Sequence, residues 1–244
     1  MSPTVRGTRI TLYDSGMLEV TEQFKEASIW AAEILGSKNT AKYYMASENF
    51  LVAYKSTESF TFVITGEPSY SQMYGPHPYF DERCDYLSVT GSEPDLLGKM
   101  QKGRGFQFWE AQAVNQDNYL ELLTDADEIN LLIDEHAPDS SVRPGDDEEV
   151  FWGGIRNDDG ELIACAVLVQ WQSGFHVMAS VVTREAERGK GYATQLSSGM
   201  VTQAHALGIK EIGLGVRTTN IAAQRAYSKA GFRQLAEFTN YSRE

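Results

Sequence analysis

The stretch from Ser180 to Thr194 has the residue types and spacing of a phosphate-binding turn. The apolar, β-branched residues 175–182 predict a strand, and the pattern over residues 193–207 predicts an amphipathic helix. Between them, Gly189 and Gly191 have no Cβ and can adopt positive φ, so a ligand can approach the backbone closely. Unpaired N–H groups and the helix dipole favour an anion at the start of such a helix. The spacing predicts a seat for phosphate oxygens, although a lone Gly-x-Gly also occurs in plain tight turns.

Residues 188–193 resemble the pyrophosphate-binding signature of the GNAT superfamily of N-acetyltransferases, in the form Arg-x-x-Gly-x-Ala. The signature positions here are Arg188, Gly191 and Ala193, and a strand ending at Thr183 precedes them. Residues further downstream, at 213–220, 226–227 and 230–232, are similar to the second half of that family. The resemblance is clear over about residues 150–244 and looser over 105–149. It is strongest to the branch that includes the glycine N-acyltransferase C-terminal domains.

The resemblance implies transfer of an acetyl group from acetyl-coenzyme A (acetyl-CoA) to an amine. The pyrophosphate would bind the backbone amides of the glycine turn, and the pantetheine arm would pair with the end of the preceding strand. A backbone amide near Val181 would donate to the thioester oxygen and polarise the carbonyl. The strand residues are equally compatible with an ordinary buried strand. The residues implied in cofactor binding are Val181, Val182, Thr183, Arg188, Gly189, Lys190, Gly191, Tyr192, Ala193, Thr194 and Asn220.

Tyr227 is the candidate acid. It follows Asn220 in a predicted helix, and the two turns between them, about 10.5 Å along the axis, return to nearly the same face. In the family that this sequence resembles, a tyrosine at this place protonates the coenzyme A sulfur, and the asparagine contacts the cofactor arm. The alternative role of Tyr227 is core packing above the sheet.

The general base is less clearly marked. His176 begins the central predicted strand, roughly where some members of the family carry a catalytic glutamate, and an imidazole can deprotonate an ammonium near neutral pH. Glu110, on an earlier predicted strand, and a chain of water molecules are the rival candidates. The other histidines of the sequence are assigned no role; they are His77, His136 and His205.

The net charge of −13 argues against nucleic-acid binding, and it is unevenly distributed. Residues 105–160 hold 2 basic and 15 acidic side chains, whereas residues 161–244 hold 9 basic and 6 acidic ones. By resemblance, the helices and loop of residues 105–160 border the acceptor side of the cleft. An acidic wall there favours a cationic acceptor, such as a polyamine, an aminoglycoside-like amine or a basic peptide. The alternative is that these carboxylates only solvate a surface loop.

Other features of the sequence exclude whole classes of protein. No apolar run reaches the length of a membrane span, and the N-terminus lacks the apolar core of a signal peptide. Cys84 and Cys165 are too few for a disulfide framework and are expected to be reduced core thiols of a cytoplasmic protein. No Cys/His spacing indicates a metal site. The sequence leaves open whether the chain forms a homodimer.

The chain is expected to contain an N-terminal α/β region of unknown role, residues 1–104, and an acyltransferase domain, residues 105–244. The first is predicted to contain a helix over 15–35, strands over 8–13, 49–54 and 59–64, and a turn-rich aromatic segment near 70–79. The second has the order β, α, α, β, β, β, α, β, α, β, which matches a GNAT-type mixed central sheet flanked by helices. Its first helical stretch is predicted over 117–136 with a break near 124, and its last strand over 232–238. Cores of this type end with a further strand, for which residues 239–244 are too few.

Two other functions are compatible with these patterns. The first is a non-catalytic acyl-CoA-binding or regulatory module on the same fold, against which the intact Arg188–Ala193 signature and Tyr227 argue. The second is a glycine N-acyltransferase-like enzyme that uses longer acyl groups. Nothing in the sequence identifies the acceptor.

Overall fold

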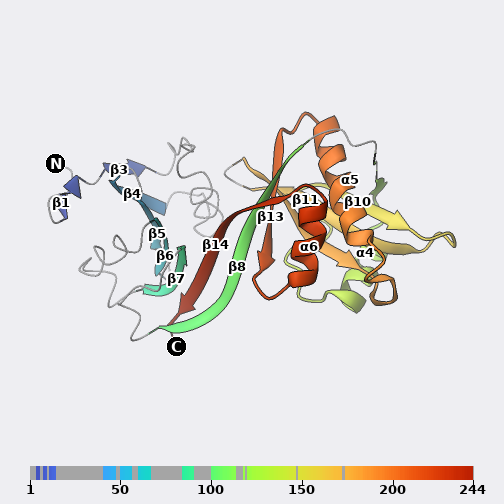
Figure 1. Cartoon of the computed structure of the whole chain (residues 1–244), viewed down its shortest axis with the longest axis horizontal. Coiled ribbons are helices and arrows are strands. Elements are labelled where there is room, and N and C mark those ends of the chain that lie inside the picture. Colours follow the sequence, from blue (N-terminus) through green and yellow to red (C-terminus); the bar gives the residue numbers. More distant parts are fainter. Residues whose placement is uncertain are drawn as a thin grey trace. The chain divides into compact units, whose positions relative to one another are not determined.

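The computed structural model describes seven strands before residue 91 and, from there on, residues 100–113, 118, 120–146, 148–171 and 174–243. The chain forms two compact units, residues 1–107 with 236–244 (unit 1) and residues 108–235 (unit 2). Strands β8 (Gln101–Gln112) and β14 (Arg233–Ser242) each run from one unit into the other. The C-terminal residues therefore group with the N-terminal region (Figure 1).

Unit 1 is built on strands that follow the hydrogen-bonded order β3-β4-β5-β6-β7-β14. Its pairs are antiparallel except for β6 with β7, and β1 and β2 pair separately. The predicted strands correspond to β2 with β3, to β5 and to β6, whereas β4 and β7 were not predicted. The predicted helix over 15–35 and the segment near 70–79 lie outside the described residues. The bounds are β1 (Thr4–Val5), β2 (Thr8–Arg9), β3 (Thr11–Asp14), β4 (Ala41–Ser47), β5 (Phe50–Ser56), β6 (Phe60–Gly66) and β7 (Cys84–Thr90).

The last strand of the chain is longer than predicted. β14 continues past the expected end at residue 238 to Ser242, and its second half pairs antiparallel with β7 between Thr90 and Tyr86. A strand of the N-terminal region therefore lies beside the C-terminal one. The sequence pattern alone could not show this pairing, because the partners are far apart in the chain.

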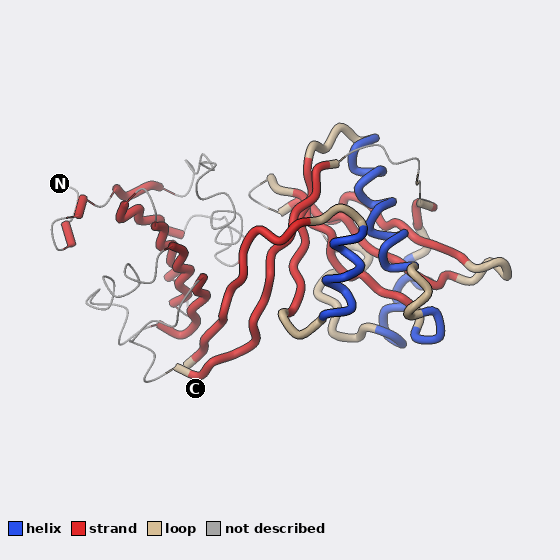
Figure 2. The backbone as a smooth tube through the Cα atoms, viewed as in Figure 1, coloured by secondary structure: helices blue, strands red, loops and turns tan. Residues whose placement is uncertain are grey.

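Unit 2 is a mixed α/β fold, which confirms the expected class. Its strands follow the order β14-β8-β13-β12-β11-β10-β9, antiparallel in the recorded registers except for β12 with β13. All the described helices belong to this unit (Figure 2). The remaining elements are β9 (Glu121–Leu123), α4 (Ala126–His136), β10 (Glu149–Arg156), β11 (Leu162–Gln170), β12 (His176–Thr183), η3 (Glu185–Glu187), α5 (Tyr192–Ala206), β13 (Glu211–Arg217) and α6 (Ile221–Lys229).

Strand β11 forms the buried centre of unit 2. Every residue from Leu162 to Val169 is buried, as expected for a strand covered on both faces. Ala164, Ala166 and Leu168 belong to the core cluster that includes Leu196 and Met200 of α5. The alternate residues of a strand point to the opposite face, where α4 packs. Cys165 is one of them; it is a buried free thiol, and burial raises its pKa to about 12.

The two faces of the sheet carry different helices. A Cβ atom added to Gly153 of β10 would lie 2.9 Å from the Met200 sulfur of α5, whereas one on the next residue, Gly154, would meet Leu123. Helices α5 and α6 pack on each other and lie side by side in Figure 1. The sheet therefore separates the pair α5 and α6 from α4.

The helical stretch predicted over residues 117–136, with a break near 124, was wrong before that break. Residues 121–123 form β9, an edge strand whose Leu123 pairs with Trp152 of β10. The helix begins only after Asp125, whose side chain accepts hydrogen bonds from the backbone N–H groups of Asp127 and Glu128. Three residues give too little periodicity to distinguish a strand from a helical turn.

Strand β12 pairs with β13 only near its N-terminal end. Its parallel register with β13 is recorded only at Val177↔Gly213 and Met178↔Leu214, although β12 continues to Thr183. On its other edge, Cys165↔Val182 and Val167↔Ala179 differ by an extra β12 residue, which is a bulge. The end of β12 therefore has a backbone edge that β13 does not cover.

Candidate active site

A pocket of about 580 Å³ in unit 2 collects most of the predicted site residues. Its walls come from the end of β12, the turn before α5, helix α6, and the C-terminal end of α4. Every predicted cofactor-binding residue except Lys190 lines it, and Tyr227 does as well. The pocket-lining residues from that prediction are Val181, Val182, Thr183, Arg188, Gly189, Gly191, Tyr192, Ala193, Thr194 and Asn220.

The turn before α5 requires glycine at two positions. Gly189 and Gly191 have φ angles of +82° and +94°, which L side chains rarely adopt. A Cβ atom built on either would have no atom within 4 Å, so the pocket reaches the backbone itself. The first N–H groups of α5, which begins at Tyr192, have no intrahelical partner. Together with the helix dipole, they make this corner of the pocket suited to an anion.

Arg188 holds two segments of the pocket wall together. Its Nε donates to the Thr183 carbonyl of β12 at 3.2 Å, and an Nη donates to the His136 carbonyl at the end of α4 at 2.9 Å. A guanidinium beside the last carbonyls of a helix also complements the negative end of the helix dipole. The side chain of Arg188 thus shapes the pocket through these two hydrogen bonds.

Lys190 does not line the pocket, and its side chain forms an ion pair with Glu187. Its Nζ lies 3.0 Å from a Glu187 carboxylate oxygen, and Glu187 lines the pocket. Without this partner, the carboxylate would repel an anion in the turn. Lys190 therefore contributes by compensating a nearby negative charge.

Helix α6 supplies the opposite wall. The Asn220 side chain caps this helix by accepting a hydrogen bond from the Ala223 N–H at 3.2 Å. The Thr194 hydroxyl donates across to the Ala226 carbonyl of α6 at 3.4 Å. The roles proposed for Asn220 and Thr194 toward a ligand therefore coexist with structural hydrogen bonds.

Tyr227 is the most deeply buried ionisable side chain of the pocket. It is 6% exposed, and its ring packs against Phe232 with 6.1 Å between the ring centroids. Burial raises its pKa to about 12, so the phenol keeps its proton at neutral pH. The neutral phenol is a hydrogen-bond donor at the edge of a pocket that also accommodates anions.

The comparison with protein families agrees with this geometry. Residues 116–232 match the model of the acetyltransferase (GNAT) family. These residues form a GNAT acetyltransferase domain. The specific glycine N-acyltransferase-like branch is not singled out by this match. No curated protein matches the chain significantly.

Solved structures share the fold of this chain at low sequence identity. A GCN5-related N-acetyltransferase from Sphaerobacter thermophilus is 12% identical with a TM-score of 0.56, and the alignment covers 99% of this chain and 96% of that one. A GCN5-related N-acetyltransferase from Kribbella flavida is 13% identical with a TM-score of 0.56, covering 93% and 96%. A GNAT-family acetyltransferase from Colwellia psychrerythraea is 12% identical with a TM-score of 0.52, covering 96% and 100%. At these identities, the likeness concerns the fold alone.

The histidine chosen as candidate base is not in the pocket of the GNAT domain. His176 is the first residue of β12, paired with Gln170, and it does not line the pocket with Tyr227. Burial lowers its pKa. Glu110, the rival, is 2% exposed on β8, has Arg233 at 3.7 Å, and does not line the pocket either.

His136, which the sequence analysis passed over, does line the pocket. It is the last residue of α4, its side chain is 14% exposed, and its Nε2 lies 3.5 Å from a Glu135 carboxylate oxygen. The signal that could have found it is its place at a helix end followed by a polar loop. Of the remaining histidines, His205 bonds the Ala113 carbonyl, and His77 lies outside the described residues.

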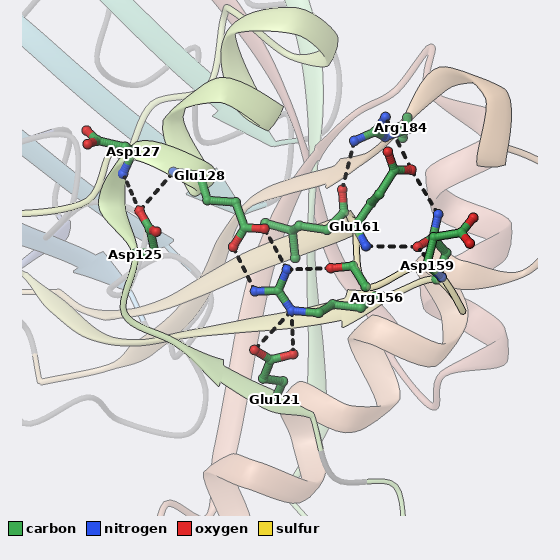
Figure 3. A network of polar contacts seen from close by, with 11 residues as sticks. Glu121, Asp125, Asp127, Glu128, Arg156, Asp159, Glu161 and Arg184 are labelled. Carbon is green, nitrogen blue, oxygen red and sulfur yellow. Dashed lines mark hydrogen bonds and ion pairs between the residues drawn. The ribbon is translucent and has the colours of Figure 1, made fainter.

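Several of the acidic side chains of residues 105–160 have structural partners (Figure 3). The Arg156 guanidinium, on β10, donates to both carboxylate oxygens of Glu121 and of Glu128, at 2.9 Å and 2.7 Å for the Nε and Nη2 bonds. These hydrogen bonds lower the pKa of Glu128 and raise that of Arg156. Arg143 likewise contacts Asp134 at 2.7 Å. These carboxylates are already compensated, which reduces the negative potential that this region can exert on a ligand.

Neither a metal nor a membrane helix is indicated by the described part of the chain. No group of three or more His, Cys, Asp or Glu side chains in that part could hold a metal ion. None of its helices is long and apolar enough to cross a membrane.

The burial of Tyr227 should appear in the pH dependence of stability. Its pKa is about 12 in the folded protein against about 10 in an unfolded chain. The neutral form is favoured by folding, so its contribution is complete below pH 10 and is lost as the pH rises toward 12. We expect the free energy of unfolding of the wild type to fall by about 2 kcal/mol relative to Tyr227→Phe across that interval.

Urea unfolding at several pH values measures this difference, because the phenylalanine variant has nothing to ionise at the site. Tyr192→Phe, at a half-buried tyrosine of the same pocket, is the control and should change the curve less. Parallel pH curves for the wild type and Tyr227→Phe would contradict the assignment.

Proposed function

We propose that this protein transfers an acetyl group from acetyl-CoA to a primary amine of a small molecule or peptide, by direct attack in a ternary complex. The observation that carries the proposal is one pocket that joins an anion-binding glycine turn, an uncovered strand edge and a buried neutral tyrosine. The free thiol of Cys165 fits the cytoplasmic location that we propose for the protein.

The pocket offers one group for each part of the donor. The backbone amides from Arg188 to Ala193 would bind the pyrophosphate, with no side chain in the way at Gly189 and Gly191. The uncovered edge of Val181–Thr183 would pair with the amides of the pantetheine arm, as an added strand does. A backbone N–H at the β12 bulge would donate to the thioester oxygen while negative charge develops on it.

Tyr227 would complete the reaction by protonating the leaving sulfur. The amine nitrogen forms its bond to the carbonyl carbon, the carbon–sulfur bond breaks, and the phenol proton goes to the sulfur. Its raised pKa keeps the proton on Tyr227 until negative charge develops on the sulfur. The proton that the amine loses requires a base, for which His136 is the histidine that lines the pocket and His176 is more remote.

The glycine turn gives the sharpest test of cofactor binding. Gly191→Glu would place a carboxylate in the proposed phosphate seat and should abolish binding of coenzyme A by steric overlap and charge repulsion. Gly208→Glu is a matched control, because Gly208 also has a positive φ, +79°, and no atom within 4 Å of a Cβ, yet lies outside the pocket. Each variant should lose about 1–2 kcal/mol of stability from the left-handed backbone.

Calorimetric titration with coenzyme A measures the expected difference. Binding that survives in Gly191→Glu would refute the assignment of the turn. Acyl-chain competition with longer acyl-CoA esters in the wild type separates an acetyltransferase from an enzyme of the glycine N-acyltransferase type. Tight cofactor binding without transfer to any amine of a panel would favour a non-catalytic module.

The second test concerns the proposed acid. Tyr227→Phe keeps the ring packed on Phe232 and removes only the hydroxyl. General acid catalysis contributes about 10²–10⁴-fold, so we expect a fall in kcat of that order with little change in acetyl-CoA binding. Steady-state kinetics with the best amine of the panel measure it. An unaltered kcat under conditions where the chemical step is rate-limiting would exclude Tyr227 from this role.

We also propose that the acceptor is cationic, on the charge partition of the chain. Residues 105–160 hold 15 acidic and 2 basic side chains. Arg156 and Arg143 compensate part of this charge, so the carboxylates that would act are those close in the chain to the pocket-lining His136 and Ala137, such as Glu135 and Asp139. At physiological salt, exposed charges are screened over about 8–10 Å, so only carboxylates close to the pocket would attract a cationic acceptor.

A salt series tests this proposal. Electrostatic attraction predicts that kcat/KM for a polyamine such as spermidine exceeds that for a neutral hydroxylamine-type acceptor, and that the ratio shrinks as salt rises. Asp139→Asn should reduce the ratio, whereas Asp159→Asn, on the exposed β10–β11 turn, serves as the control. A preference for acidic acceptors, or a ratio that salt does not change, would contradict the proposal of a cationic acceptor.

A further inference from the structure

Ser180, next to the pocket-lining Val181, has an unusual backbone conformation. Its φ angle is +45°, and it is the one non-glycine residue with positive φ in the described part of the chain. This region costs an L-residue about 1–2 kcal/mol, and such residues persist where the surroundings determine them. Ser180 lies in the β12 bulge, immediately before Val181, which lines the pocket.

The side chain of Ser180 makes two hydrogen bonds to a single residue of another segment. Its Oγ accepts from the Val142 N–H at 3.2 Å and donates to the Val142 carbonyl at 2.9 Å. A hydroxyl has one proton and two lone pairs, so it can make both bonds at once. The backbone of Val142 is therefore attached to the bulge by a side chain that only serine or a close analogue could supply.

Val142 belongs to the loop of residues 137–146, which leaves α4 at the edge of the pocket. Ala137 lines the pocket, and the loop is braced internally by Arg143, which reaches Asp134 at 2.7 Å and Asp146 at 2.8 Å through its side chain and its N–H. A weaker contact joins Asp139 to Arg217 of β13 at 3.9 Å, between exposed side chains. Ser180 thus provides the firmest attachment of this loop to β12.

The loop follows α4, which packs on the face of the sheet opposite α5 and α6. The glycine turn and α6, on the other side, make up the walls proposed for the donor. An amine must approach the thioester carbonyl from a direction that the donor and its binding groups leave open. The loop of residues 137–146 borders the pocket at Ala137, next to His136 at the end of α4.

We propose that Ser180 is a positioning residue for the acceptor step: it fixes the loop of residues 137–146 to the β12 bulge as the acceptor-side wall of the pocket. This inference rests on the proposed transferase function. It adds a residue whose loss affects the amine substrate and spares the binding of coenzyme A.

Three variants separate the hydroxyl from the backbone strain. Ser180→Gly removes both hydrogen bonds but relieves the positive φ, and Ser180→Ala removes them while keeping the strain. Ser141→Gly makes the same chemical change at an exposed neighbour of Val142 and is the matched control. Thermal unfolding checks that each variant folds. Of the two variants at position 180, Ser180→Gly is expected to be the more stable, because glycine tolerates the positive φ.

Hydrogen exchange tests the attachment without any substrate. In Ser180→Gly and Ser180→Ala, the Val142 amide should exchange about tenfold faster or more, since it loses its acceptor. The Arg143 amide, which donates to Asp146, is an internal reference and should change less. Unchanged exchange at Val142 in both variants would overturn the proposal.

Kinetics test the positioning role. With the best amine of the panel, Ser180→Gly should lower kcat/KM for the amine about 3–30-fold, mainly through KM. The Kd for coenzyme A should stay within about twofold of the wild-type value. If Ser180 had only a structural role, its loss would weaken the binding of both substrates equally or of neither. Either result would contradict the proposal. A wild type that binds coenzyme A but acetylates no amine would instead overturn the proposed function, while the exchange experiment would still judge the attachment.

Discussion

The pocket depends on the separation of two parallel strands. β12 and β13 pair only at Val177↔Gly213 and Met178↔Leu214, and beyond this point β12 runs on to Thr183 without that neighbour. Backbone N–H and C=O groups need partners, so an uncovered strand edge is a template for another extended chain. Gly213, in the first of these two pairs, has no room for a side chain, because a Cβ there would lie 2.5 Å from the Phe108 ring. Beyond Met178, the edge of β12 that faces β13 is therefore open to hydrogen bonds from a ligand.

The charged side chains around the pocket stabilise its walls more than they offer charge to a ligand. Arg188 donates to the carbonyls of Thr183 and His136, and Lys190 compensates Glu187. The proposed anion site then consists of backbone amides of a turn whose glycines have φ angles of +82° and +94°. Amides fixed by the fold need little reorganisation when a ligand binds, whereas long cationic side chains lose rotamer freedom.

Local patterns predicted the parts of the site that are local. The glycine turn and helix α5 each depend on a few consecutive residues, and the continuous apolar run of β11 marks a strand buried on both faces. The features that the sequence did not reveal join distant segments. His136 reaches the pocket because Arg188 ties the end of α4 to β12, and Ser180 was indistinguishable from any polar strand residue until Val142 was found beside it. Pairing between strands far apart in the chain, such as β7 and β14, produces no periodic pattern in the sequence.

Tyr227 shows how packing and chemistry constrain each other in this site. Its ring fills the core between α6 and Phe232, and the same burial that stabilises the ring raises the pKa of its hydroxyl. A phenol with a pKa of about 12 is a weaker acid than one in water, so transfer of its proton must accompany the appearance of negative charge nearby. In the proposed reaction, burial beside Tyr227 would also make a leaving thiolate harder to stabilise and more basic, because burial disfavours its charged form as well. The environment that weakens the proposed acid would therefore strengthen the base that it is proposed to protonate, and the two changes would offset each other.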